Sequence, residues 1–369
     1  MLAPLRDHLS PKDPKSSSLL CTTKECYFTR MSYPNKPNSR EARWIRSEDV
    51  NVEHLLDILT TIDPDSGHVW VACANFMEHL YWHKKRLTTL RPKIEGLPDY
   101  HNSKPKCLYE LSRLFYSVRN NVECERLAYH ALKVWREQGD DKNVARVLGH
   151  LSDTNRLMGL PKQGIQQARE ALNIYERLGD TMRQARCLDN LALSLRDDNQ
   201  IDAAEEAAFR AIALLPDEGE QFWLCELHQT LGKIYRSKDE IEKAIHHFEV
   251  ALGIASSFNW HGRLFWIHYK LAGMFHDQGR FDDTEAHLER AKLHAVDNAY
   301  YLGLAMELQA RAWHKQGRLE GARTEALAAA DVYEKLGTAR KVEDCKKLLR
   351  KIEDSLVAPS QSALSCEFL

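Results

Sequence analysis

Hydrophobic and polar positions repeat every forty residues along most of this chain. A leucine recurs at one register and a small residue follows it each time; the leucines are Leu111, Leu151, Leu191, Leu231 and Leu271. Alanines hold a second register about twenty residues later, at Ala131, Ala171, Ala211, Ala251 and Ala291. Apolar residues between these anchors follow helical spacing, so the pattern predicts an array of helical units.

One period shows how each unit is expected to fold. Residues Leu191–Pro216 read LALSLRDDNQIDAAEEAAFRAIALLP, with a polar break between two apolar stretches and a closing proline. We therefore predict two helices folded back on each other, with small residues where they touch. Six such units are expected over residues 101–336, the sixth two residues early. Gly139, Gly179 and Gly219 are expected at helix ends, where the backbone takes positive φ.

The segments outside the array have their own predicted roles. Residues 1–43 are rich in proline and mildly basic, and are expected to be a disordered arm. Residues 44–100 are expected to form a helical N-terminal cap: a short helix ending before Asp63-Pro64, then a longer one over Val69–Leu90, with breaks at Arg91-Pro92 and Leu97-Pro98.

The C-terminal end is expected to close the array. Val342, Cys345, Leu349, Ile352 and Leu356 form one apolar stripe opposite several lysines and arginines. Residues 337–356 therefore predict a capping helix whose polar back faces water, and residues 357–369 a flexible tail.

Composition narrows the class of protein without deciding its role. The 369 residues are 43% apolar and 28% charged, with a formal net charge of −2. This balance suits a soluble helical protein and gives no general attraction to nucleic acid or membranes. Nine scattered cysteines, no long apolar run and no secretory leader predict a reduced, cytoplasmic protein.

The segment Leu231–Leu252, LGKIYRSKDEIEKAIHHFEVAL, carries the closest match to a known repeat. Leu231, Gly232 and Tyr235 in its first helix, and Ala244, Phe248 and Ala251 in its second, resemble the signature of the tetratricopeptide repeat (TPR). The resemblance implies an all-α fold, a right-handed α-solenoid of helical hairpins with helical caps at both ends. The forty-residue period resembles the extended units of kinesin light chain. In the second unit Asn155 and Gly164 replace an aromatic residue and an alanine, so looser packing is expected there.

A second resemblance concerns the order of the segments. The stretch from Glu41 through residues 72–86 into the repeats looks like the C-terminal part of fungal STAND ATPases, which place a nucleotide-binding module before a TPR sensor array. This chain has no phosphate-loop motif, since Gly232-Lys233 belongs to a repeat helix. The resemblance implies a sensor or regulatory fragment as the alternative function.

Catalytic chemistry finds no support in the sequence. His79 and His83 lie one helical turn apart, which could suit zinc, but no third ligand accompanies them and we expect a packed pair. Of His246 and His247, which precede the core position Phe248, one is expected to face solvent. We predict a protein that is not an enzyme and has no cofactor or metal site.

Binding chemistry is better supported. In the TPR family the first helix of each unit lines the concave face, and the residues predicted to lie there are Arg113, Arg146, Arg156, Arg186, Asp189, Arg196, Lys233, Arg236 and His276. Three of them, Arg156, Arg196 and Arg236, recur forty residues apart; we call them the arginine ladder. Arginine binds carboxylates bidentately, so an acidic protein or peptide segment is the expected partner. Alternatively, these arginines pair with Asp153, Asp189 or Asp197 and only join the units.

Two more specific modes of interaction were also considered. The carboxylate clamp of chaperone-binding TPRs needs lysine and asparagine at places that here hold Tyr109, Arg113, His150, Arg186 and Asn190, so that type is not expected. The last four residues, from Cys366, have the spacing of a prenylation signal, but Glu367 is unsuited to it. We expect a non-catalytic scaffold that binds protein, with no nucleic-acid partner and no stable membrane association unless Cys366 is prenylated. The sequence leaves the oligomeric state open.

Overall fold

The computed structural model describes residues 90–216, 220–295 and 298–364, together with isolated positions between 56 and 77; side chains are described to residue 357. The chain divides into two units, residues 1–207 and 208–369, which are treated separately below. The predicted arm (1–43), most of the predicted N-terminal cap and the last five residues lie outside the described residues. Within that cap, Trp70, Cys73 and Met77 are described and buried, as their apolar stripe predicts.

All regular structure in the described ranges is helical, which confirms the all-α prediction. Unit 1 contains α5 (Leu90–Gly96), α6 (Lys104–Ser117), α7 (Asn121–Glu137), α8 (Asp141–Leu157), α9 (Pro161–Leu178) and α10 (Thr181–Asp197), and α11 (Ile201–Ala213) spans the boundary. Unit 2 continues with α12 (Gln221–Ser237), α13 (Ile241–Ser257), α14 (His261–Asp277), α15 (Phe281–His294), α16 (Ala299–Lys315), α17 (Leu319–Lys335) and α18 (Ala339–Leu364).

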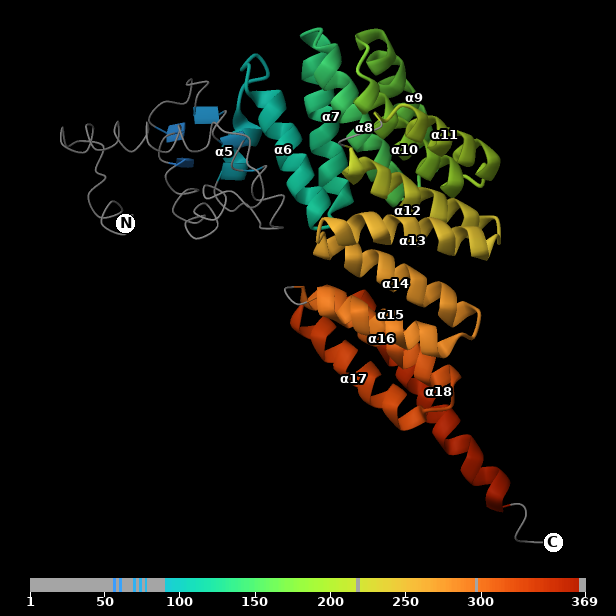
Figure 1. Ribbon diagram of the computed structural model, residues 1–369. Helices are drawn as coiled ribbons and strands as arrows, with labels where there is room; N and C mark the ends of the chain where they lie inside the picture. Colours follow the sequence, from blue (N-terminus) through green and yellow to red (C-terminus); the bar gives the residue numbers. More distant parts are fainter. Residues whose placement is uncertain are drawn as a thin grey trace. The chain divides into compact units, whose positions relative to one another are not determined.

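Consecutive helices form hairpins, and consecutive hairpins stack within each unit (Figure 1). We call the first helix of each hairpin the A helix (α6, α8, α10, α12, α14, α16) and the second the B helix. The A helices from α8 to α14 begin at residues 141, 181, 221 and 261, and α16 begins at 299, two residues early as the sequence predicts. The fold is thus a solenoid of TPR-like helical hairpins.

A left-handed residue marks the turn after nearly every helix. Positive φ occurs every twenty residues, at Arg119, Gly139, Gly159, Gly179, Asn199, Asp239, Asn259 and Gly279. Gly139 and Gly179 confirm their prediction, whereas Gly219 lies outside the described residues. Several helices then begin on an N-cap side chain: Asp140 accepts from the amide of Asn143, and Asp180 from that of Arg183. Turn and cap together fix the length of each helix.

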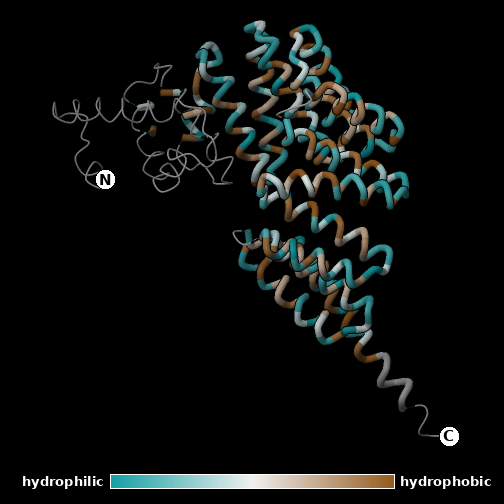
Figure 2. The backbone as a smooth tube through the Cα atoms, in the orientation of Figure 1, coloured by the Kyte–Doolittle hydropathy of each residue, from teal (hydrophilic) through white to brown (hydrophobic). Residues whose placement is uncertain are grey.

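The two predicted registers form the cores of the hairpins. The five anchor leucines are at most 6% exposed, and the five register alanines are fully buried. Figure 2 shows the result, with hydrophobic and hydrophilic positions alternating around each helix. Helices α12 and α13 approach each other closely at Gly232 of α12. A methyl group on this residue would lie 2.6 Å from Cε2 of Phe248 in α13. The small residue after the leucine therefore makes room for the B-helix aromatic ring.

The structure differs from the sequence prediction at both ends of the array. Residues Leu90–Gly96 form the short helix α5, where a break was predicted at Arg91-Pro92. Pro92 stands in the first turn, where the missing amide donor costs little. At the other end α18 continues past Leu356 to Leu364, so it covers part of the predicted flexible tail.

Packing around the second hairpin is tight, contrary to the expectation from Asn155 and Gly164. A methyl group on Gly164 would lie 2.9 Å from both the carbonyl oxygen of Ser152 and the hydroxyl of Ser194. Ser152 Oγ donates to the Gly164 carbonyl at 2.8 Å, and the buried Asn155 amide donates to Gln167 at 2.9 Å. Backbone contact and polar pairing replace the usual aromatic packing here.

Candidate functional site

In unit 1 the A helices present a connected set of charged side chains, and Glu110 of α6 lies at its start. This carboxylate is 1% exposed and holds two arginines: Arg113 Nη1 is 2.6 Å from Oε2, and Arg146 Nη2 of α8 is 3.3 Å from Oε1. Arg146 also lies over the ring of Tyr109, 4.6 Å from its centre. The pair of arginines thus joins α6 to α8, and 31% of the Arg146 side chain remains exposed.

His150 of α8 lies next to this pair, between two tyrosine rings. Its imidazole centre is 5.6 Å from that of Tyr109 and 5.3 Å from that of Tyr116. Burial, followed by the positive charge of Arg113, lowers the pKa of His150 to about 3; Arg186 and Arg146 lower it further and Asp153 opposes them. Arginines from α6, α8 and α10 therefore act together on one neutral imidazole.

The set continues through two aspartates along α8 and α10. Asp153 accepts from Tyr116 Oη and from Arg156, whose Nη2 is 2.5 Å away. Burial acts to raise the pKa of Asp153, but Arg156 and the Tyr116 hydroxyl outweigh it and the pKa falls below its usual value. Asp197 is shared, since it lies 3.1 Å from Arg156 Nη1 and 2.5 Å from Arg196 Nη2.

The remaining predicted residues of unit 1 lie on α10. Arg186 is exposed and Asp189 is buried, and both interact with neighbouring groups. Along the A-helix face five arginines accompany four carboxylates, and all nine residues belong to α6, α8 or α10. We call this set the unit 1 arginine network; its members are Arg113, Arg146, Arg156, Arg186, Arg196, Glu110, Asp153, Asp189 and Asp197.

Within the network the arginines differ in how far they are enclosed. The side chains of Arg113, Arg156 and Arg196 are 13%, 14% and 17% exposed and have short contacts with carboxylates. Arg146 and Arg186 are more accessible. Arg146 and Arg156 pair between helices, with Glu110 of α6 and Asp197 of α10 respectively, whereas Arg113 and Arg196 pair with a carboxylate of their own helix.

In unit 2 the predicted residues meet at one aspartate. Arg236 Nη2 of α12 lies 2.8 Å from Asp277 of α14, and His276 Nδ1 lies 3.3 Å from the same carboxylate. Arg156 of unit 1 pairs with Asp197 at the same separation of forty-one residues, so both arginines join successive A helices. Lys233, also on α12, interacts with neighbouring groups.

Another buried carboxylate, Glu307 of α16, was not among the predicted site residues. It pairs with Arg311 at 2.5 Å and with Lys341 at 2.9 Å, and accepts from Tyr333 Oη at 3.2 Å. Burial followed by the charge of Glu307 raises the pKa of Tyr269 to about 12. Glu110 and Glu307 precede the small residues Ser112 and Ala310 of their A helices, but nothing in the sequence distinguishes them from exposed helical carboxylates.

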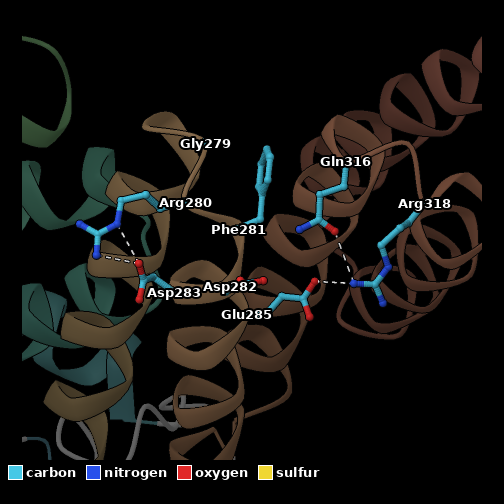
Figure 3. Close-up of a pocket in the computed structure, with 8 residues that line it drawn as sticks. All are labelled: Gly279, Arg280, Phe281, Asp282, Asp283, Glu285, Gln316 and Arg318. Carbon is cyan, nitrogen blue, oxygen red and sulfur yellow. Dashed lines mark hydrogen bonds and ion pairs between the residues drawn. The ribbon is translucent and has the colours of Figure 1, made fainter.

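A shallow pocket of about 560 Å³ lies at the turns of α14–α15 and α16–α17 (Figure 3). Phe281 stands between two ion pairs, Arg280–Asp283 and Arg318–Glu285, the latter with its atoms 2.6 Å apart. Both arginines of the pocket are therefore paired with carboxylates of its wall. None of its lining residues was predicted as a site residue, although the ring of Phe281 meets that of the predicted His276 edge to face, with centres 6.3 Å apart.

The remaining candidate groups are histidines and cysteines outside the two sets described above. His79, His83 and Cys366 lie outside the described residues. In the described ranges no group of three histidine, cysteine or carboxylate side chains could hold a metal ion. The described cysteines are buried free thiols, and burial raises the pKa of both Cys107 and Cys187 to about 12. No helix in that part of the chain is long and apolar enough to cross a membrane.

Comparison with known proteins gives the fold but no family. No family model matches this chain, and no curated protein matches it. Solved structures do resemble it. A Rap protein in complex with Competence and Sporulation Factor has a TM-score of 0.59 at 14% identity, covering 91% of this chain and 99% of that chain.

Two further structures have a similar fold. Aspartyl phosphate phosphatase F from Bacillus subtilis has a TM-score of 0.52 at 14% identity, with 93% of this chain and 94% of that chain covered. The APC/C hetero-tetramer Cut9-Hcn1 has a TM-score of 0.51 at 16% identity, with 94% and 58% covered. These neighbours are TPR-like helical repeat proteins, and the likeness supports the fold alone.

Proposed function

We propose that this protein is a non-catalytic interaction scaffold whose unit 1 arginine network binds an acidic segment of a partner protein. The observation that carries the proposal is the convergence of Arg113, Arg146 and Arg186, from three successive A helices, on one neutral histidine. The five arginines of the network outnumber its four carboxylates, Glu110, Asp153, Asp189 and Asp197, so this face keeps an excess of positive charge. A carboxylate brought to this face would receive charge-assisted hydrogen bonds.

Accessibility decides which arginines are proposed to contact the partner. Arg113, Arg156 and Arg196 are enclosed and ion-paired, so we assign them a structural role, in which Arg156 also joins α8 to α10. Arg146 and Arg186 remain accessible to solvent and are the proposed contacts. In unit 2 Arg236, which pairs with Asp277, is assigned the same helix-joining role as Arg156. Of the two sequence hypotheses, inter-unit pairing thus applies to Arg156 and groove contact to Arg186, while Arg146 combines both because it also pairs with Glu110 of α6.

The fold supports binding of an extended or helical segment rather than catalysis. Stacked hairpins place equivalent A-helix positions in a row, so a partner segment could contact several of them at once. A protein of similar fold has been solved in complex with Competence and Sporulation Factor, which is consistent with such a role. We also propose a cytoplasmic location, on the buried free thiols.

Selection from a random peptide library provides the test. Peptides are selected on the wild-type chain and then measured against R146Q/R186Q and against R169Q. Arg169 is exposed on the B helix α9 and serves as the matched control. We expect selected peptides rich in aspartate and glutamate that bind R169Q normally and R146Q/R186Q at least tenfold more weakly. Peptides without acidic enrichment, or unchanged binding to R146Q/R186Q, would refute the proposal.

The alternative, a sensor array regulating a STAND-type ATPase, rests on segment order alone. Its discriminating observation is genomic: an in-frame phosphate-loop motif upstream of residue 1 would favour it. The acidic-segment proposal does not depend on that result, because a sensor array also binds through its helical face.

A further inference from the structure

Histidines occupy the seam between the two helices of a hairpin in unit 2. His261 and His268 lie seven residues apart on α14, and His287 and His294 lie seven apart on α15. Because the helices run in opposite directions, these residues meet as two pairs. The Nδ1 atoms of His268 and His287 are 3.0 Å apart, and those of His261 and His294 are 3.2 Å apart.

The two pairs are continuous with each other. The rings of His268 and His294 are stacked, with centres 6.0 Å apart, so four imidazoles follow one another along the seam. The preceding hairpin repeats the arrangement forty residues earlier. There His228 of α12 and His247 of α13 have Nδ1 atoms 3.0 Å apart, and His247 stacks on Tyr235.

Two imidazoles in this arrangement are sensitive to their protonation. One Nδ1–H donates to the other Nδ1, which must carry a free lone pair. When both rings are protonated, both nitrogens become donors, so the hydrogen bond is lost and two positive charges face each other. The seam therefore tolerates neutral or singly protonated pairs, but not doubly protonated ones.

The charged groups around the pairs give little compensation for added protons. Burial, then His287, His294 and Arg290, lower the pKa of His268 to about 4. Burial, Arg290 and Arg280 lower the pKa of His287, and only Asp283 opposes them. Burial, followed by His261, lowers the pKa of His294.

The neighbouring helices bring no further compensation. Burial, followed by His246 of α13, lowers the pKa of His228. Helices α13 and α16 also pack against the α14–α15 hairpin, and among the described residues neither brings a carboxylate that raises the pKa of a seam histidine. Protons added to the seam therefore meet mainly other histidines and arginines.

We propose that these three histidine pairs form a pH-sensitive seam, which loosens the α12–α13 and α14–α15 hairpins when the protein enters a mildly acidic environment. The seam is independent of the unit 1 arginine network, since all six histidines belong to unit 2. Acid would then weaken this part of the solenoid without an effector molecule.

The direction of the effect follows from proton linkage. A histidine whose pKa is lower in the folded chain than in the unfolded chain binds fewer protons when folded. Its contribution to stability is complete above the unfolded value of about 6.5 and is lost as the pH falls towards the folded value. For His268 the folded value is about 4. Between pH 7.5 and 5.0 this single shift would raise the unfolding equilibrium constant about 20- to 30-fold.

Urea unfolding of the full chain at pH 7.5 and 5.0, followed by circular dichroism, tests the proposal. The variant H287N/H294N removes one imidazole from each pair of the α14–α15 hairpin. We expect the rise in the unfolding constant between the two pH values to be smaller in the variant than in the wild type, because two imidazoles with lowered pKa and their charges beside His268 are removed. The buried His150 of unit 1 contributes equally to both chains and cancels in this comparison.

H314N is the matched control, because His314 of α16 faces Ser355 and not another imidazole. H314N should show the same pH dependence of unfolding as the wild type. If H287N/H294N also shows the wild-type pH dependence, the proposal is overturned. If that variant does not fold, NMR titration of the wild-type histidines gives the answer. His268 should stay neutral at pH 5.5, and its titration near 6.5 would overturn the seam.

Discussion

Gly232→Ala tests the packing rule on which the solenoid depends. The new methyl carbon would lie 2.6 and 2.7 Å from Cε2 and Cδ2 of Phe248, distances that carbon atoms do not adopt without movement. Phe248 is 1% exposed, so its ring cannot move into solvent without leaving the core. Overpacking of this kind costs about 1–3 kcal/mol. Alanine recovers about 1 kcal/mol through helix propensity, so we expect a net loss of about 0–2 kcal/mol.

Gly273→Ala is the matched control for this substitution. Gly273 also lies inside an A helix of unit 2, but a methyl group there meets no atom within 4 Å. We expect this variant to gain about 0.5–1 kcal/mol from helix propensity alone. Urea unfolding of both variants and of G232A/F248L measures the difference, and the smaller leucine should restore part of the loss. Equal stabilisation by G232A and G273A would refute the proposed role of Gly232.

Three further predictions concern buried polar groups and thiols. Ser194→Ala should raise the free energy of unfolding by about 1 kcal/mol, measured by urea titration, because the Ser194 hydroxyl is buried with no hydrogen-bond partner in the described part of the chain. Glu110→Gln should lower it by about 1–3 kcal/mol, since Arg113 and Arg146 would lose their shared carboxylate. The control Glu170→Gln, at the exposed pair with Arg136, should change the free energy of unfolding by less than about 1 kcal/mol in the same titration. Equal losses in the Glu110 and Glu170 variants would contradict the role of Glu110. Burial raises the pKa of Cys107 and Cys187 to about 12, so iodoacetamide at pH 8 should modify both only in urea, as peptide mapping by mass spectrometry would show; modification of the native chain would contradict their burial.

The sequence was most informative where local chemistry and packing agree. The leucine and alanine registers predicted the cores of the hairpins, because the forty-residue period marks the same buried helix face in every unit. Local signals were less reliable at the ends of the array. Pro92 appeared to break the chain, but it is tolerated in the first turn of α5. Gly164 suggested loose packing, whereas the absent side chain allows the helices to come closer.

The candidate site could be predicted only in part. The sequence placed the arginines on successive A helices, but their partners depend on how neighbouring helices align. Asp197 contacts both Arg156 and Arg196, and the buried Glu110 contacts Arg113 and Arg146, which spacing alone does not reveal. The sequence also predicted that one of His246 and His247 faces solvent, without deciding which. In the structure His246 is exposed, whereas His247 packs against His228. This confirms that one of the two faces solvent.

The affinity of an acidic peptide for three forms of the full chain tests the central claim most directly. A fluorescein-labelled peptide of alternating glutamate and glycine is titrated with wild type, R146Q/R186Q and R169Q, and Kd is measured by fluorescence anisotropy at fixed ionic strength. The unit 1 arginine network predicts equal Kd values for wild type and R169Q and at least a tenfold higher Kd for R146Q/R186Q. Equal Kd values for all three chains, each shown to be folded by circular dichroism, would contradict it.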